Sequence, residues 1–303
     1  MSTALSQGFP FFRGGSEPLQ EARAYCERLT RRTALNFYYA FLFLKERDRH
    51  TAFAIYSYCR TADDLADDER LSVHERLSAL ERFEDQLETC WLGEPVGHPV
   101  FQALQPILAR REVSLEPFRL LLKGMRQDLT VTRYATFREL ETYCYHVAAV
   151  VALMLIPVFD PERASDLQAY AREGGTAVQL TNILRDVRED AHMGRIYLPQ
   201  EDLDRFGVAE SELLSDRPTE AFRDLMAYEV ERARGYYEAA EAILTPRDRR
   251  RQQALEAARA IYRHLLDEIV RRRYDVLSGR LSLSGPRKLG LALGSLARGW
   301  AGR

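Results

Sequence analysis

Apolar residues recur every three or four positions along most of the chain, a spacing typical of amphipathic α-helices. Strand signals are nearly absent, because no clear run of alternating β-branched residues is closed by a tight turn. The segment 36–44, NFYYAFLFL, is apolar on every side, so we expect it to be deeply buried. The pattern predicts an all-α protein with helices over residues 17–30, 36–44, 50–67, 73–92, 99–110, 115–129, 136–155, 161–189, 209–215, 218–244, 246–276 and 286–298.

The chain shows no internal boundary between domains. A length of 303 residues would allow about two domains, but no Gly/Ser-rich or Pro-rich linker and no repeat divides the sequence. The main irregular stretch is 192–202, HMGRIYLPQED, where Gly194 and Pro199 interrupt helical continuity. We therefore expect a single domain over residues 1–303, a helical bundle with its binding site in a central cavity.

Composition and charge narrow the functional classes. The 43 basic and 45 acidic residues leave a net charge of −2, which argues against nucleic acid as the main partner. The four cysteines lack CxxC or zinc-ligand spacing, which favours buried free thiols and a cytoplasmic location. The N-terminus has no signal-peptide pattern, and the longest apolar run, 147–159, is shorter than the about 20 residues of a membrane span.

Carboxylates gather at the end of an apolar helix. Five of the seven residues from Asp63 to Glu69 are acidic, and the preceding stretch RHTAFAIYS is largely apolar. On a helix, Asp63 and Asp67 are four residues apart and point to one face. Such a group is either a solvated helix end or a site for something strongly positive.

A second acidic stripe lies far along the chain. Asn182, Asp186 and Asp190 fall at i, i+4 and i+8 of a predicted buried helix. Burying these charges costs several kcal/mol unless they are compensated. Mg²⁺ compensates carboxylates well and completes its shell with substrate phosphates and water.

Arginines accompany both acidic sets. Arg60 precedes the first set by one turn, while Arg185 and Arg188 lie within the second and Arg195 follows it. Guanidinium groups suit bidentate phosphate contacts. Two acidic sets that each carry arginines favour a magnesium–diphosphate site over two solvated helix ends.

These motifs resemble those of a known family. YCRTADDLADD (58–68) and QLTNILRDVREDAHMGRIYLPQEDL (179–203) resemble the two aspartate-rich motifs of the squalene/phytoene synthase family, the head-to-head prenyl diphosphate synthases. Weaker matches extend the resemblance over about residues 30–293, and they include segments 36–44, 133–154, 233–240 and 274–293.

The resemblance implies a fold and a site. The fold would be an all-α isoprenoid synthase-type bundle around a central cavity. Mg²⁺ would be held by Asp63, Asp67, Asp186 and Asp190, with Asn182 assisting. Prenyl diphosphates would be contacted by Arg60, Arg185 and Tyr56, and further by Phe37, Gln179, Tyr236 and Arg280. Tyr145 and His146 lie on the central helix, and neither is assigned as the catalytic base.

One departure from the family pattern bears on the substrate. Ala149 and Ala152 stand where the family helix usually has glycines. The added methyl groups would narrow the hydrocarbon tunnel and favour C15 farnesyl diphosphate, giving presqualene diphosphate or squalene. The alternative is a phytoene synthase that uses C20 geranylgeranyl diphosphate. Whether NADPH supports a second step stays open.

Two more distant readings compete. A terpene cyclase would share the fold, but its second metal motif typically mixes Asn, Ser or Thr, and Glu. A non-catalytic helical protein at a membrane surface would use the basic amphipathic tail RKLGLALGSLARGWAGR (287–303). That tail is also compatible with an enzyme peripheral to a membrane. No obligate protein partner is predicted.

Overall fold

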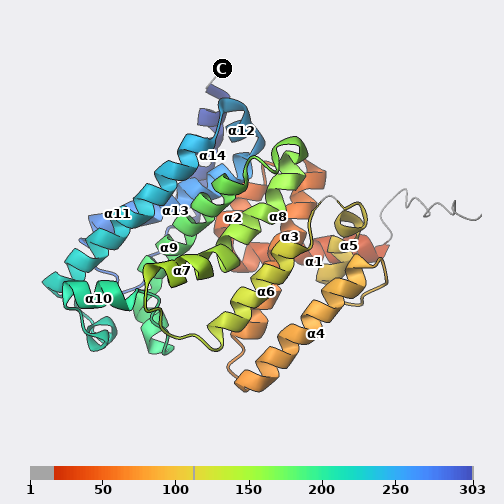
Figure 1. Ribbon diagram of the computed structural model, residues 1–303. Coiled ribbons are helices and arrows are strands. Elements are labelled where there is room, and N and C mark those ends of the chain that lie inside the picture. Colours follow the sequence, from red (N-terminus) through yellow and green to blue (C-terminus); the bar gives the residue numbers. More distant parts are fainter. Residues whose placement is uncertain (1–16, 112, 302–303) are drawn as a thin grey trace, which may run out of the picture.

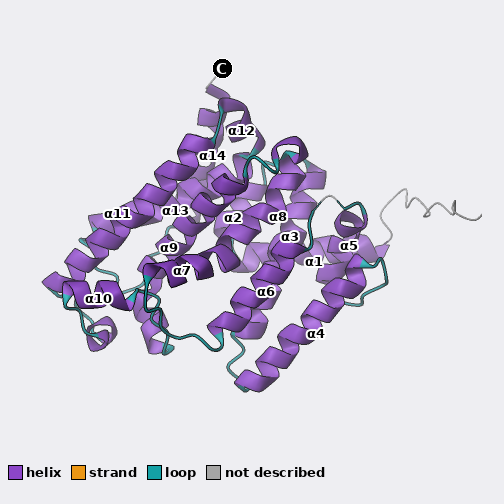
Figure 2. Cartoon of the chain, viewed as in Figure 1, coloured by secondary structure: helices purple, strands orange, loops and turns teal. Residues whose placement is uncertain are grey.

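The computed structural model describes residues 17–111 and 113–301 (Figure 1). All regular elements in this part of the chain are helices (Figure 2), and one isolated parallel β-bridge pairs Arg133 with Ile196. The all-α prediction is therefore confirmed. The α-helices are α1 (Glu17–Thr33), α2 (Leu35–Phe41), α3 (Glu46–Ala66), α4 (Val73–Trp91), α5 (Pro99–Ala109), α6 (Glu116–Asp128), α7 (Phe137–Cys144), α8 (Val150–Phe159), α9 (Gln168–His192), α10 (Gln200–Phe206), α11 (Glu220–Ile243), α12 (Pro246–Arg251), α13 (Gln253–Arg271) and α14 (Gly285–Ala301).

The longest helix, α9, organises the bundle. It packs against α11, α8 and α13, which approach it from different sides. Figure 1 shows α11 on one side of the molecule and α4 and α5 on the opposite side, with α8, α3 and α6 between them. Because α9 carries the second acidic motif and α3 the first, this arrangement brings the two motifs into one bundle.

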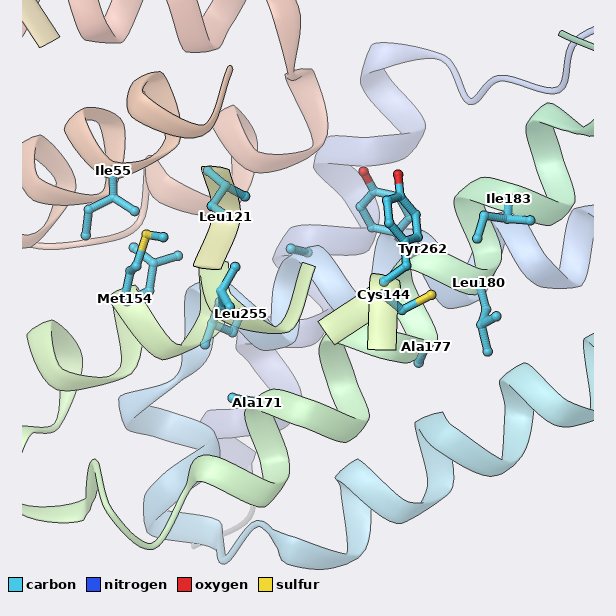
Figure 3. Packing of buried hydrophobic residues seen from close by; sticks show 14 of the residues in the cluster. Ile55, Leu121, Cys144, Met154, Ala171, Ala177, Leu180, Ile183, Leu255 and Tyr262 are labelled. Atoms are coloured by element: carbon cyan, nitrogen blue, oxygen red, sulfur yellow. The ribbon is translucent and has the colours of Figure 1, made fainter. Parts of the chain in front are cut away.

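Buried apolar side chains form a contiguous cluster that extends from α1 to α14. Figure 3 shows part of it, with labelled side chains from α3, α6, α7, α8, α9 and α13. The expectation for segment 36–44 is met in part, because Ala40 and Phe41 are fully buried while Phe37 and Tyr38 are only partly buried. Phe37 is also one of the residues that line the central cavity.

Local capping explains several helix starts. Ser72 and Glu75 form a reciprocal capping box at the start of α4. The side chain of Thr136 caps α7 and that of Thr219 caps α11. These polar groups satisfy backbone N–H groups that the first helical turn leaves without partners.

The predicted helix 136–155 is not uniform. A π-helical turn, η1 (Tyr145–Ala149), separates α7 from α8, and α8 continues through Pro157 to Phe159. A π turn holds an additional residue and changes which side chains face a neighbour. Periodicity alone did not reveal this turn, because the apolar pattern continues across it.

Two long predicted helices are shorter than expected. The helix predicted over 161–189 begins only at Gln168, because a 3₁₀ turn, η2 (Pro161–Arg163), comes first. The helix predicted over 246–276 is divided at Gln252, whose backbone departs from helical geometry, and α13 ends at Arg271.

Only the middle of the stretch 192–202 is non-helical. The short helix α10 starts directly after Pro199 and ends at Gly207, whose φ of 67° suits glycine. A 3₁₀ turn, η3 (Glu210–Leu214), follows in place of the helix predicted over 209–215. Segment 193–199 is thus a short, non-helical connection between two helices.

The helical run Phe137–Phe159 is long and apolar enough to cross a membrane by length and composition. In the structure, 61% of its most apolar window is buried inside the protein. The run packs against α6, α9 and α3, so it serves as a core helix of the bundle.

Candidate active site

The first acidic motif closes α3. Arg60 donates a hydrogen bond of 2.7 Å from Nη1 to Oδ2 of Asp63 and also contacts Asp64. Asp67 is the first residue beyond the helix, and its N–H donates to the carbonyl of Asp63 at 2.9 Å. The i, i+4 spacing therefore places Asp63 and Asp67 on consecutive turns, as the sequence predicts.

The second motif occupies the last turns of α9. Arg185 binds Asp186 through both nitrogens of its guanidinium fork, with 2.7 Å from Nε to Oδ1. Arg280 approaches the same carboxylate, with Nε at 3.7 Å from Oδ1 of Asp186 and 3.3 Å from Oε2 of Glu189. In this arrangement each motif carries its own arginine counterions.

Two groups connect the motifs. Arg195, from the segment that follows α9, contacts Oδ1 of Asp67 at 3.1 Å and interacts electrostatically with Asp190. Asp128, the last residue of α6, interacts electrostatically with Asp63 and Asp190 as well. The carboxylates of α3 and α9 thus face one another around Asp128 and Arg195 and do not lie on opposite exteriors.

Burial and crowding raise the pKa values of these acids. Burial raises the pKa of Asp63 to about 7 and the carboxylates of Asp67 and Asp128 add to the increase, while Arg60 opposes it. The pKa of Asp190 is raised to about 8, mainly by burial and then by Asp186, with Arg195 opposing. The ionised forms are therefore under-compensated, and an added cation would stabilise them.

A cavity of about 260 Å³ lies beside these acids. Its polar end is formed by Arg60, Asp63, Asp128 and Asn182. From there it follows α9 toward that helix's N-terminus. The α9 residues that line it are Tyr170, Gly174, Gly175, Val178, Gln179 and Asn182. Phe37, Tyr56 and Tyr262 form an aromatic wall, with ring centroids 5.2 Å apart between Phe37 and Tyr56.

Glycines fix the π turn that forms the opposite wall. A Cβ atom on Gly175 of α9 would lie 2.4 Å from the Cα of Ala149, and one on Gly124 of α6 would lie 2.7 Å from Val147. At Gly175 the neighbouring atoms are backbone, and only glycine allows two backbones to approach so closely. From this wall Val147, Ala148, Val151 and Ala152 line the cavity, whereas Ala149 is fully buried behind it.

Sequence reasoning missed a tyrosine–carboxylate group. The hydroxyls of Tyr143 and Tyr197 each donate to Asp128 at 2.9 Å, and Tyr143 and Asp128 line the cavity. Burial raises the pKa of Asp128 to about 6, although both hydroxyls oppose the increase. Asp128 is a single carboxylate at the end of a helix, so no repeated acidic spacing marks it in the sequence. The only available signal is that it follows an apolar helix.

The structure places the predicted site residues in three groups: residues that line the cavity, residues of the acidic motifs outside its lining, and the pair Tyr236 and Arg280. Phe37, Tyr56, Arg60, Asp63, Gln179 and Asn182 line the cavity. Asp67, Asp186, Asp190 and Arg185 lie outside that lining, in the contacts described above.

Two predicted substrate contacts also lie outside the cavity lining, although Arg280 contacts the second motif. Tyr236 packs on Phe137 and donates to Glu141 at 2.6 Å, away from the cavity lining. Arg280 borders an external groove that Arg185, Arg188 and His192 also line.

The described residues contain no preformed metal cage. Among the His, Cys, Asp and Glu side chains of the described ranges, no three converge closely enough to hold an ion as they are arranged. The carboxylates of Asp63 and Asp186 are instead turned toward Arg60 and Arg185. Binding of a cation by these acids would require those arginines to change partners.

Comparisons with known proteins identify the family of the chain. The family model described as squalene/phytoene synthase matches residues 30–287. The chain is 38% identical to a 15-cis-phytoene synthase of Synechococcus elongatus, over 89% of this chain and 91% of the relative. It is also 38% identical to a phytoene synthase of Arthrospira platensis, over 84% of this chain and 86% of that protein.

Solved structures lead to the same family. A crystal structure of a dehydrosqualene synthase is similar with a TM-score of 0.84 and 34% identity, covering 94% of this chain and all of that one. The squalene synthase HpnC of Alicyclobacillus acidocaldarius is similar with a TM-score of 0.75 and 30% identity, over 86% and 97% of the two chains. The chain therefore belongs to the squalene/phytoene synthase family, whose members are prenyltransferases that join two prenyl diphosphates head to head.

Proposed function

We propose that this enzyme condenses two molecules of C20 geranylgeranyl diphosphate into phytoene. The observation that carries this proposal is the apolar cavity along α9, which begins at the acidic motifs and is long enough for four isoprene units. The relatives named phytoene synthase support it. Family membership sets the non-catalytic and terpene cyclase readings aside.

The length of the cavity can be compared with that of the substrate. Asn182 and Tyr170 are twelve residues apart on α9, about 18 Å at 1.5 Å per residue. An extended polypeptide spans about 3.3–3.6 Å per residue, and each residue contributes three backbone bonds. An extended hydrocarbon chain, by the same measure, advances about 1.2 Å per bond. Four isoprene units, with sixteen bonds along the chain, span about 19 Å and three units about 14 Å. The C20 chain matches the available length.

Only one of the two alanines on which the sequence-based preference for a C15 substrate rested lines the cavity. It assumed that Ala149 and Ala152 both narrow the tunnel. Ala152 lines the cavity, but Ala149 is fully buried behind the wall, where its backbone meets Gly175. One added methyl group does not outweigh the similarity to phytoene synthases.

The acidic residues fit a divalent cation. Asp63, Asp67, Asp186 and Asp190, with Asn182, supply the hard oxygen donors that Mg²⁺ prefers. The charges of Asp63 and Asp190 are under-compensated by the protein alone. When bound there, Mg²⁺ would neutralise the charge that builds on a departing diphosphate. We propose these residues as its ligands.

Residues of the chain itself then guide the reaction. Arg60 and Arg185 provide guanidinium groups for the diphosphate, whose loss leaves an allylic cation. The apolar cavity keeps water away from that cation, and the rings of Phe37, Tyr56 and Tyr262 offer faces that favour positive charge.

Carbon–carbon bond formation requires a proton acceptor. The 2,3-double bond of the second substrate attacks the cation, and proton loss closes a cyclopropylcarbinyl diphosphate. A second ionisation, rearrangement and proton loss would give the C40 polyene. Tyr143 and Asp128 both line the cavity and the Tyr143 hydroxyl donates to Asp128, so we propose this pair as the acceptor, with a proton taken up at the tyrosine oxygen and one passed to the carboxylate.

The test is product analysis with the purified full chain. Mg²⁺ and either C15 or C20 diphosphate are supplied, each with and without NADPH, and products are identified by mass spectrometry. We expect a C40 polyene from the C20 substrate without NADPH. A C30 product formed in preference from the C15 substrate would overturn the proposal.

A C30 synthase is the second candidate, and one observation favours it. The dehydrosqualene synthase structure superposes well on this chain, with a TM-score of 0.84. In the same assay, a C30 polyene without NADPH would indicate a dehydrosqualene-type reaction, and one that requires NADPH would indicate squalene. The comparison with and without NADPH therefore also decides whether a nicotinamide cofactor takes part.

Contact with a membrane is a separate proposal. Helix α14 packs on α13 and α2, so only its outer face, which includes Arg287 and Leu293, could rest on lipid. Flotation of the protein with anionic liposomes, compared between wild type and Leu293→Glu, tests this contact. The predicted cytoplasmic location agrees with four cysteines that form no disulfide, and it stays a prediction.

A further inference from the structure

The far end of the cavity is bounded by charged rather than apolar groups. Arg259 of α13 lines the cavity although only 9% of it is exposed. Its Nε and Nη2 atoms donate to the two carboxylate oxygens of Glu256 at 2.9 and 2.8 Å. Tyr170 of α9 also lines this end, and its hydroxyl donates to the same carboxylate at 2.9 Å.

These contacts hold Tyr170 from both ends. Its backbone lies in the first turn of α9, and its hydroxyl is fixed by the Glu256–Arg259 pair. The pair is held in turn, because Arg259 Nη1 donates to the carbonyl of Tyr237 at 3.2 Å and Arg249 approaches Glu256 at 3.4 Å.

A buried ion pair beside an apolar cavity calls for a physical reason. Apolar replacements of such pairs are often neutral or stabilising, so overall stability does not require it here. Separating the pair without replacement partners is strongly unfavourable. A hydrocarbon chain therefore cannot extend past Tyr170 by pushing Glu256 and Arg259 apart.

Gly174 lies one turn after Tyr170 on the same helix, on the side nearer Asn182, and also lines the cavity. A Cβ atom there would meet only ordinary contacts, at 3.8 Å from Ala240 and 3.9 Å from the ring of Tyr170. Packing therefore does not require glycine at this position, in contrast to Gly175. Its lack of a side chain leaves space in the last stretch of the cavity.

We propose that Tyr170, anchored by Glu256 and Arg259, is the stop that sets the maximum prenyl chain length, and that Gly174 leaves room for the fourth isoprene unit. Eight residues separate Gly174 from Asn182, about 12 Å of helix, which is close to the about 14 Å of three units. This inference rests on the proposed function and adds the residues that determine its specificity.

Substrate competition tests the proposal. We would measure kcat/KM for C15 and C20 diphosphates in wild type, Gly174→Leu and Gly235→Leu. Gly235 is an exposed glycine of α11 with open space around it, so it provides a matched control. We expect Gly174→Leu to lower the C20-to-C15 ratio at least tenfold, since single methylene groups in apolar pockets discriminate by about 10–200-fold. Gly235→Leu should keep the wild-type ratio.

A second variant tests the stop itself. Tyr170→Ala should use a C25 diphosphate at least tenfold better than wild type, because the space behind the ring becomes available. Circular dichroism and thermal midpoints establish which variants are folded, and if one does not fold, the other decides.

The outcomes separate the two proposals. A folded Gly174→Leu with an unchanged ratio, or a folded Tyr170→Ala that uses C25 no better than wild type, overturns the assignment of the stop. A wild-type enzyme that consumes neither C15 nor C20 diphosphate overturns the proposed function instead.

Discussion

Asp63 is a buried acid whose charge the protein compensates only in part. Arg60 bonds to it, but burial and the carboxylates of Asp67 and Asp128 favour the neutral form. A residue kept for stability alone would not be placed in this way. The sequence revealed Asp63 because its motif repeats charge at helical spacing, whereas Asp128 and Tyr143 act as single residues and carry no such pattern.

We predict that Asp63→Asn lowers turnover by about 10²–10³-fold, because an electrostatic group at the reacting diphosphate is lost. The fold should survive, since the substitution removes a buried charge that is crowded by like charges. Diphosphate release and the thermal midpoint check both statements. The control is Asp68→Asn, which alters a neighbour bonded to Arg70 and should leave turnover unchanged. Equal loss in both variants would contradict a specific role for Asp63.

Glu229 allows a prediction about pH. Burial raises its pKa from 4.5 to about 8, and Asp202 adds to the increase while Arg232 opposes it. The folded protein therefore holds a proton on Glu229 that the unfolded chain releases between these values. Stability should fall as pH rises through this window, because the folded state binds more protons than the unfolded state.

The measurement compares thermal midpoints at pH 5 and pH 8.5. Glu229→Gln should show a smaller decrease than wild type, since its amide does not titrate. Glu231→Gln removes an exposed carboxylate that pairs with Arg234, and it should behave as wild type. A wild-type decrease that persists in full in Glu229→Gln would assign the effect to other groups.

At the scale of elements, the π turn η1 determines what the cavity wall presents. The apolar pattern over 136–155 predicted one continuous helix, because periodicity averages over a single inserted residue. Helix boundaries near Gln168 and Gln252 were also missed, since both depend on tertiary contacts and local backbone geometry. The helices themselves, including those with both acidic motifs, were predictable from apolar spacing.

Neighbouring glycines should respond differently to the same change. Gly175→Ala places a Cβ atom 2.4 Å from the Cα of Ala149, so helices must separate, and we expect a destabilisation of about 1–3 kcal/mol. Gly174→Ala meets only contacts of 3.8 Å and longer, and it should be neutral or stabilising by up to about 1 kcal/mol. Urea denaturation of both variants gives the comparison. Similar midpoints would show that the close approach is not what requires Gly175.

At the scale of the whole molecule, the contiguous core supports the single-domain prediction, which unfolding can test. Apolar side chains from α1 to α14 share one cluster, so local loss of packing should spread through the bundle. We predict one cooperative transition, with coincident midpoints in far-ultraviolet and near-ultraviolet circular dichroism. Two separated transitions would indicate independent folding units. Fold class and family were accessible from sequence, while the length of the cavity was not, because it depends on which side chains meet across several helices.

The contact between Gly175 and Ala149 also limits how this enzyme can change. Backbone atoms of Ala149 fill the space that a Cβ on residue 175 would occupy, so substitution at position 175 cannot be used to reduce the cavity. Variation in substrate size among enzymes with this contact must therefore come from the remaining perimeter, such as Ala148, Val151 or Leu121. Main-chain packing holds the point of closest approach, while side chains around the rest of the chamber can change its size.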